Sequence, residues 1–194
     1  MLRLFEGAHS ELMRVNEMVQ DLLDYGRTQT PHLEVKNASE ILVKSCEEIS
    51  RRHASKGIRI LSEETDKEFP IRVEPNLLVR ALVNLLENAL EAAGPRGEIR
   101  VGAGYHLQNR DEIVLWIQDS GPGIPEENLK KIFSPYFTTK KSGAGLGLAL
   151  VQKWVIEMGG KIQVNNVPGG GARFELTFPA ADSEVSAESR ITTA

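Results

Sequence analysis

The sequence predicts an α+β fold: a two-layer sandwich in which one mixed sheet is covered on one face by three helices, preceded by one long helix. Three segments, 38–55, 75–93 and 148–158, carry apolar residues at helical spacing. Strand-like runs lie between them, and this order of elements favours helices gathered on one face of a sheet. A glycine triplet at 143–147 lies in no βαβ unit, which argues against a doubly wound dinucleotide-binding fold.

Composition limits the classes of function. With 194 residues, the chain is long enough for one good-sized domain and an appendage. Its net charge of -4 gives no electrostatic reason to expect nucleic acid as a partner. The single cysteine excludes an internal disulfide framework and is consistent with a reducing, cytoplasmic location. No apolar run approaches the roughly 20 residues that cross a bilayer, so no membrane segment is expected in this chain.

The first expected element is a helix over residues 3–27. Glycine and proline are absent between Ala8 and Tyr25. Its apolar stripe consists of Leu12, Val15, Met18, Val19, Leu22 and Leu23. Because an isolated helix has nowhere to bury such a stripe, we expect residues 1–30 to pair with a partner helix.

Residues 31–180 are expected to form the main domain, which begins with a short strand and the helix over 38–55. Asn37 precedes this helix and Glu40 follows three residues later, a spacing typical of a capping pair. The first strands are expected at 33–35, 57–61 and 69–73.

The helix expected over residues 75–93 begins at Pro75, a residue that suits the first helical turn. Asn84 and Asn88 are four residues apart, so their side chains stack on one face beside the apolar stripe. Amides in that position need hydrogen-bond partners, and a nucleotide with its Mg²⁺ would supply them. An amide oxygen suits magnesium, which keeps much of its water shell.

A hairpin is expected from the strand 98–106 and the very apolar run 113–117, which predicts a buried strand. This run ends at Asp119, which is followed by a turn that contains Gly121 and Gly123. The carboxylate of Asp119 is able to accept a hydrogen bond from an exocyclic amine, such as that of a purine base.

A short helix over 125–133 is expected next, followed by the polar segment 134–143, which we interpret as a mobile lid. Thr138, Thr139 and Lys140 would offer hydroxyl groups and a cation to a terminal phosphate.

The glycines from Gly143 to Gly147 lead directly into the helix over 148–158. Glycine lets backbone N–H groups approach an anion closely, and the helix N-terminus adds unsatisfied donors and the positive end of a dipole. A phosphate is expected there; with the carboxylate of Asp119 at the other pole, the pattern indicates a purine nucleotide. Two further strands are expected at 161–164 and 172–178. The tail over 181–194 is expected to be disordered.

Four motifs carry a family resemblance. They are Asn84 to Ala89, Asp119 to Gly123, Phe133 to Lys140 and Gly143 to Leu148. In this order they resemble the N, G1, F and G2 boxes of sensor histidine kinases, most of all those of the nitrogen-regulation type. Four ordered motifs are far more specific than a lone glycine triplet. The resemblance implies the Bergerat (GHKL) ATP-binding fold over residues 31–180, with ATP and Mg²⁺ as ligands.

The resemblance also implies roles for individual residues. Asp119 would recognise adenine, Asn88 would hold Mg²⁺, and Asn84 and Lys140 would act in catalysis, with Lys140 at the γ-phosphate. The implied nucleotide-binding residues are Asn84, Asn88, Asp119, Gly121, Gly123, Ile124, Thr138, Thr139, Lys140, Gly143, Gly145, Leu146, Gly147 and Leu148.

The implied activity is that of the catalytic core of a two-component sensor histidine kinase. It would transfer the γ-phosphoryl group of ATP to a histidine outside this chain, for relay to a response-regulator receiver domain. Residues 1–30 would be the second helix of the dimerisation hairpin, without the first. The full-length protein would then be a homodimer, whereas this chain alone is compatible with a monomer. A cytoplasmic location includes the cytoplasmic part of a membrane-bound sensor.

His9 is the one histidine that faintly resembles a phospho-acceptor. Only residues 10–20 separate it from Asp21, which leaves no room for a hairpin between them. We therefore expect His9 to be a solvated or interface histidine.

Two other functions stay open at this point. One is a catalytically silent nucleotide-binding scaffold, and the other is a hydrolytic ATPase of the same fold. Such ATPases place a water-activating glutamate where this chain has Asn84, so hydrolysis is expected to be slow here. The chain also departs from the kinase pattern at Glu91 and Ala92, where many members have a basic and an aromatic residue, and at Ala172, where a threonine often stands.

Overall fold

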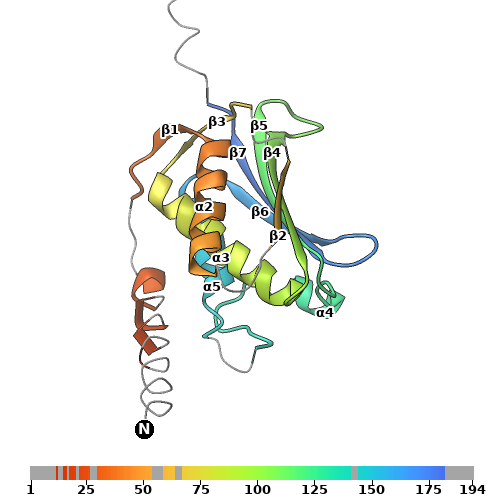
Figure 1. Cartoon of the computed structure of the whole chain (residues 1–194). Coiled ribbons are helices and arrows are strands. Elements are labelled where there is room, and N and C mark those ends of the chain that lie inside the picture. The colour runs from red at the N-terminus through yellow and green to blue at the C-terminus, as the bar shows by residue number, and fades with distance from the viewer. Residues whose placement is uncertain are drawn as a thin grey trace, which may run out of the picture.

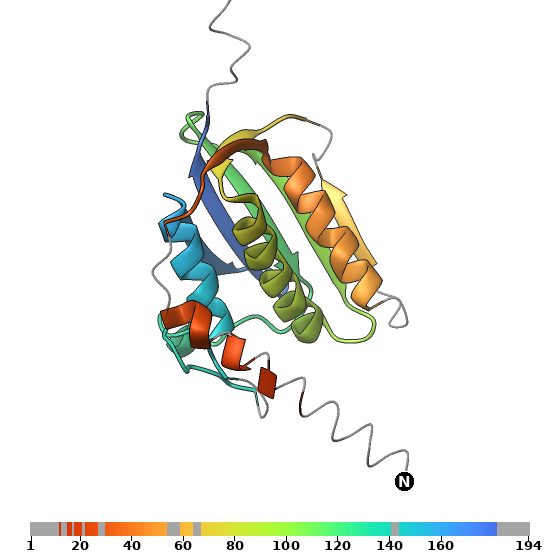
Figure 2. The same ribbon diagram turned by 90° about the vertical axis from the view of Figure 1, so that its left-hand side faces the viewer.

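The computed structural model describes residues 12, 15–16, 18–20, 22–26, 30–53, 59–63, 67–140 and 144–181. It confirms the predicted fold class, because a five-stranded mixed sheet lies against three helices on one of its faces (Figure 1 and Figure 2). The helices of this layer are α2 (Ala38–Arg52), α3 (Pro75–Ala93) and α5 (Gly147–Glu157).

The strand order of the main sheet is β2-β4-β5-β7-β6. Its members are β2 (Arg59–Glu63), β4 (Glu98–Tyr105), β5 (Glu112–Asp119), β6 (Lys161–Asn166) and β7 (Ala172–Pro179). β2 runs parallel to β4 and the other neighbouring strands are antiparallel, which makes the sheet mixed. The predicted hairpin is formed by β4 and β5, with Ile99 opposite Asp119 and Tyr105 opposite Ile113.

The two remaining strands form a pair of their own. β1 (Glu34–Asn37) and β3 (Pro70–Val73) are antiparallel, and an isolated bridge between Ile71 and Ala180 connects them to the end of β7. The sequence indicated both strands. Their separation from the main sheet depends on long-range pairing, which a pattern in so short a strand does not specify.

The hydrophobic core lies between the helices and the sheet. In β5, every second residue is buried, and the apolar members Ile113, Leu115 and Ile117 are at most 1% exposed. This alternation is that of a strand with one face against the helix layer. From α3, Leu78 and Leu82 are fully buried against it, as the predicted stripe requires. The core thus fixes α3 and the end of β5 relative to each other.

Asn37 caps α2, as predicted. Its side-chain oxygen accepts hydrogen bonds from the backbone N–H groups of Ser39 at 3.1 Å and Phe69 at 3.0 Å. Its amide nitrogen lies 3.5 Å from the carboxylate of Glu40. One cap therefore begins α2 and also ties it to the segment before β3.

Within the described residues, the short helix predicted over 125–133 differs clearly in length from the observed one. α4 (Glu126–Leu129) is followed by turns in which Lys131 N–H donates to Asn128 O at 2.8 Å and Ser134 N–H donates to Lys131 O at 2.8 Å. These tighter hydrogen bonds replace the α-helical pattern and carry the chain around to the segment before α5.

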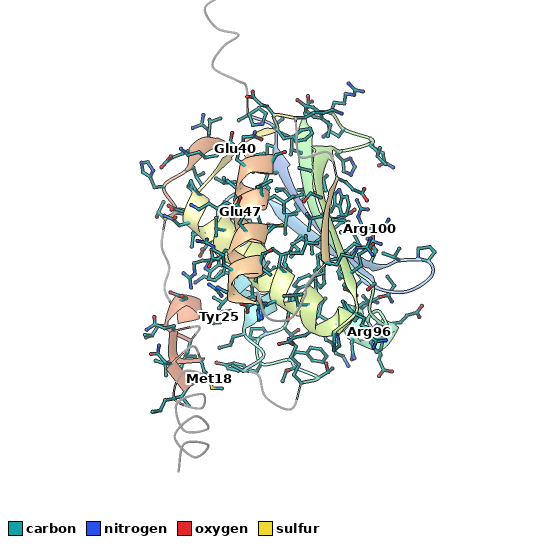
Figure 3. All side chains as sticks on the ribbon, in the orientation of Figure 1. Met18, Tyr25, Glu40, Glu47, Arg96 and Arg100 are labelled. Carbon is teal, nitrogen blue, oxygen red and sulfur yellow. The ribbon has the colours of Figure 1, made fainter. Side chains whose placement is uncertain are left out.

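The described residues within 12–26 are helical, and we refer to them as the N-terminal helix. Figure 3 labels Tyr25 beside the helix layer and Met18 farther along this helix. His9 and residues 182–194 lie outside the described part of the chain. Within that part, no helix is both long enough and apolar enough to span a bilayer.

Candidate functional site

A cavity of about 630 Å³ is lined by residues of the second half of α3, the turn after β5 and the start of α5. It is lined by most of the residues singled out from the sequence: Asn84, Asn88, Asp119, Gly123, Ile124, Thr138, Thr139, Lys140, Gly145, Leu146, Gly147 and Leu148. Two other residues of that set are not among the lining residues. Gly121 supports the site through a hydrogen bond, and Gly143 lies outside the described residues.

Asp119 is the buried carboxylate of this cavity, with 4% of its surface exposed. One of its oxygens accepts from Gly121 N–H at 2.8 Å, and the other accepts from Ala172 N–H at 3.3 Å. Burial raises the pKa of Asp119 above its usual value, and the hydrogen bonds from Gly121 and Ala172 oppose this rise. Because both donors are backbone groups, the carboxylate is held in place by the turn after β5 and by the start of β7.

The turn after Asp119 is fixed by a side chain that the sequence did not indicate. Asn166, at the end of β6, accepts from Ile124 N–H at 2.8 Å and donates to Ile124 O at 2.7 Å. Gly123 has a φ of 80°, and a Cβ there would lie 2.8 Å from the Asn166 side-chain oxygen. Glycine is therefore required both for the backbone conformation and for this close approach.

The two asparagines of α3 lie together on the cavity wall, as their spacing predicts. Asn88 donates from its amide nitrogen to the Asn84 oxygen at 3.3 Å, which leaves the Asn88 oxygen facing other partners. Gly147, at the start of α5, lies so close to Asn84 that a Cβ would come within 2.8 Å of its oxygen. Asn84 thus also sets the distance between α3 and α5.

Lys140 reaches the Asn88 oxygen across the cavity. Its ammonium group donates to that oxygen at 2.7 Å and also forms an ion pair with the carboxylate of Glu91, one turn farther along α3. The Lys140 backbone N–H donates to the Thr138 hydroxyl oxygen at 3.0 Å. The asparagine expected to hold a metal cation therefore has a cationic side chain as its partner in this structure.

The N-terminus of α5 opens into the same cavity. Leu146 is the N-cap, and no side chain caps the first N–H groups of the helix. α5 has 11 residues, so these donors coincide with the positive end of a substantial helix dipole. Gly145 precedes it with a φ of 67°. Donors and dipole together suit a phosphate group.

The chemistry of these groups fits a magnesium nucleotide. The described residues contain no cluster of three His, Cys, Asp or Glu side chains that would bind a metal by itself. Mg²⁺ needs fewer protein ligands, because phosphate and water oxygens complete its shell, and Asn88 offers one amide oxygen. Asp119, Lys140 and the residues that begin α5 all line this cavity.

Several lining residues were not indicated as part of the site. Further side chains from α3, the region from α4 to α5 and β7 also line the cavity, together with one of the N-terminal helix: Glu87, Glu91, Ala92, Pro125, Asn128, Ile132, Phe137, Ala144, Ala172, Phe174 and Met18. Most of them are ordinary core residue types, so no local signal distinguishes them. Their place in the site follows only from the tertiary fold.

A protein-family model named "Histidine kinase-, DNA gyrase B-, and HSP90-like ATPase" matches residues 73–182. This match covers more than half of the chain and includes every element that lines the cavity except the N-terminal helix. The chain therefore belongs to this family of ATPases.

Within the family, the chain is similar to sensor histidine kinases. It is 37% identical over 169 residues to the sensor histidine kinase ZraS of Salmonella typhimurium, an alignment that covers 87% of this chain and 36% of that protein. The chain thus spans about a third of the length of the curated relatives that it matches first.

Solved structures give the same result. The catalytic domain of histidine kinase ThkA superposes with a TM-score of 0.69 at 29% identity, over 77% of this chain and 96% of that one. The complex of ThkA with the response regulator TrrA gives 0.76 at 28% identity, over 89% of this chain and 49% of that one. Full-length ShkA in complex with AMPPNP gives 0.77 at 25% identity, over 93% and 40%.

Proposed function

We propose that this chain is the ATP-binding catalytic core of a two-component sensor histidine kinase. It would bind Mg·ATP and transfer the γ-phosphoryl group to a histidine outside this chain, for relay to a response-regulator receiver domain. The observation that carries the proposal is that Asp119, Asn88, Lys140 and the open N-terminus of α5 line one cavity. Membership of the ATPase family and similarity to sensor kinases support it.

At the base end of the cavity, Asp119 would accept a hydrogen bond from the exocyclic amine of adenine. Its two backbone donors already orient it, so no reorganisation of the carboxylate is needed when the base enters. Ala172 contributes its backbone N–H to this arrangement, which a threonine at that position would also do. Absence of the threonine hydroxyl therefore leaves the orientation of Asp119 intact.

At the phosphate end, the N–H groups that begin α5 and the ammonium group of Lys140 would bind the phosphates. The amide oxygen of Asn88 would be a ligand of Mg²⁺, and the hydroxyl groups of Thr138 and Thr139 lie along the same wall. Mg²⁺ bound there would neutralise phosphate charge. Lys140 would neutralise the charge that develops on the γ-phosphoryl group.

In the proposed reaction, an imidazole nitrogen of the acceptor forms a bond to the γ-phosphorus while the bond to the β,γ-bridging oxygen breaks and ADP leaves. Catalysis of this kind needs positioning and charge neutralisation more than a base. Asn84 carries no ionisable group, and its amide is engaged with Asn88. Slow hydrolysis by water and transfer to a histidine are both consistent with an asparagine at this place.

Binding of nucleotides by calorimetry tests the proposal. We expect ADP and ATP to bind the native chain more tightly with Mg²⁺ than without it. Asp119→Asn should weaken both by about 10-fold or more, because a charge-assisted hydrogen bond contributes about 1.5–3 kcal/mol. Binding that does not depend on Mg²⁺ would instead favour the silent scaffold. Phosphate release by the chain alone, abolished in Asn84→Ala, would favour the hydrolytic ATPase.

The assembly that we propose follows from the N-terminal helix. Among its described residues, Leu12, Val15, Leu22 and Leu23 are between 48% and 70% exposed. An exposed apolar stripe of this kind suits the second helix of a dimerisation hairpin, within residues 1–30. The full-length protein would then be a homodimer with its kinase domain, residues 31–180, in the cytoplasm.

A further inference from the structure

The ammonium group of Lys140 is held by two groups of α3 at once. It donates to the Asn88 oxygen at 2.7 Å and forms an ion pair with Glu91. Asn88 in turn donates to Asn84, so Glu91, Lys140, Asn88 and Asn84 form one connected chain of contacts along the cavity wall. We infer that Glu91 retains Lys140 on α3 in the nucleotide-free protein and thereby weakens binding of ATP relative to ADP. This inference rests on the proposed function.

The Asn88 oxygen is the partner of one cation in this structure and the proposed ligand of another. In this structure its partner is the positive charge of Lys140. The same oxygen is the ligand that we propose for Mg²⁺. Two cations do not share one amide oxygen at close range, because the repulsion between them is large at such distances. Lys140 therefore has to leave Asn88 when the magnesium nucleotide binds, and the contact with Glu91 opposes this movement.

The γ-phosphate makes the effect of ATP on Lys140 different from that of ADP. Lys140 gains a new anionic partner only when a γ-phosphate is present, so ATP draws it away from Glu91 whereas ADP does not. Once Lys140 has moved, the Glu91 carboxylate is left without this partner on the wall of a cavity that holds several phosphate charges. Both the broken ion pair and the repulsion from phosphate reduce the affinity for ATP more than for ADP.

The size of the effect follows from exposure. The Lys140 and Glu91 side chains are 45% and 62% exposed, so water and salt screen their interaction. An exposed ion pair of this kind changes an equilibrium by about two- to fivefold. We therefore expect Glu91 to adjust the preference between the two nucleotides without deciding whether they bind.

Calorimetry on Glu91→Gln tests the inference. In the presence of Mg²⁺, the Kd for ATP should fall by about two- to fivefold, while the Kd for ADP changes less, so the preference for ATP increases. Glu74→Gln is the matched control. It removes the same charge from the residue that precedes the first turn of α3, at the opposite end of this helix from Glu91, and Glu74 does not line the cavity. The ratio of the two Kd values should therefore stay as in the native chain.

A double-mutant cycle with Lys140→Met separates the effect of the Lys140–Glu91 ion pair from a general effect of removing a negative charge. If Glu91 acts through Lys140, Glu91→Gln should change the ratio of Kd values less in the Lys140→Met background than in the native chain. An unchanged ratio in Glu91→Gln, or the same change with and without Lys140, would overturn the inference. In either case nucleotide binding by the native chain would still stand. Loss of the proposed function would instead appear as no nucleotide binding by the native chain.

Discussion

Asp119 combines burial with a charge, and its two backbone donors explain how both are tolerated. The carboxylate is 4% exposed, and burial raises its pKa, whereas hydrogen bonds from Gly121 and Ala172 favour the ionised form. A carboxyl group with a raised pKa in the folded state binds its proton more tightly than in the unfolded chain. Its contribution to stability is therefore present below the unfolded pKa and is lost as the pH rises through the folded pKa.

This leads to opposite pH dependences of stability and binding. As the pH falls from neutral, Asp119 takes up a proton sooner than an ordinary aspartate and becomes a poorer acceptor for the adenine amine. We expect the affinity for ADP to fall in this range, as measured by calorimetry, while the Asp119 contribution to the free energy of unfolding rises. That contribution amounts to about 1.4 kcal/mol for each unit by which its pKa is raised.

The control for this prediction is Asp119→Asn, which removes the titrating group. Urea unfolding of the native and variant proteins should show that the variant becomes more stable relative to the native chain as the pH rises. A difference in stability that does not change with pH would show that Asp119 has the same pKa in both states.

At the scale of single residues, the sequence predicts polar groups that lie within one continuous motif. Asp119 and Asn88 were indicated in this way, and both line the cavity. Asn166 was missed, because it comes from the end of β6 and its contact with Ile124 spans 42 positions. The ion pair between Lys140 and Glu91 was missed for the same reason. The first contact depends on the end of β6 lying beside the turn after β5, and the second on the packing of α3 against the segment before α5.

At the scale of elements, the described residues of the N-terminal helix contact the helix layer through polar and charged groups. Arg80 of α3 pairs with Asp24 and also lies 4.5 Å from the centre of the Trp154 ring. Lys153 of α5 donates to the carbonyl oxygens of Asp24 and Tyr25, each at 2.9 Å. Cations at the last carbonyl groups of a helix interact favourably with its dipole. We call these residues of α3 and α5 the cationic clamp.

Breaking the cationic clamp should release the N-terminal helix from the domain. In Arg80→Gln we expect faster amide hydrogen exchange at residues 22–26, with little change in α2 or β5. Arg80→Gln and Asp24→Asn should be non-additive by about 0.5–1 kcal/mol in urea unfolding, because they remove the two partners of one ion pair.

Arg96→Gln provides a matched control for this prediction. It removes the same charge from an exposed residue that Figure 3 places across the molecule from Tyr25. Hydrogen exchange in the N-terminal helix should therefore stay unchanged in this variant. Equal exchange in Arg80→Gln and the native chain would show that the clamp does not hold the helix.

The sequence predicts the elements of this fold well where local signals are strong. α2, α3 and α5 carry apolar stripes, Asn37 is a recognisable cap, and β4 and β5 are joined by a short turn. The sequence predicts element lengths and strand pairing less well where tertiary contacts determine them. The helix expected over 125–133 ends at Leu129, because the chain turns there to reach the segment before α5, and β1 pairs with β3 across the whole of α2.

At the scale of the whole molecule, the sheet and the helix layer together line the candidate nucleotide cavity, whereas the described part of the N-terminal helix carries exposed apolar side chains. Leu12 is 70% exposed, and Met18 of the same helix lines the cavity. This helix therefore contacts the candidate nucleotide site and leaves apolar side chains exposed. In the proposed kinase, those side chains would face a partner helix, and the phosphate donor and the phosphate acceptor would belong to separate units.

Transfer in trans tests this view of the whole molecule. With ATP labelled at the γ-phosphate, we expect this chain alone to incorporate no acid-labile, base-stable label, because we propose that the acceptor histidine lies outside it. Addition of a polypeptide that carries the acceptor hairpin of a sensor kinase should give labelled histidine, and Lys140→Met should reduce the rate by about 10-fold or more, since it removes a charge that stabilises the transition state. His9→Gln is the control and should transfer at the native rate. Label on His9 of the chain alone would contradict the assignment of the acceptor to another segment, and absence of label on an intact added hairpin would contradict the kinase function itself.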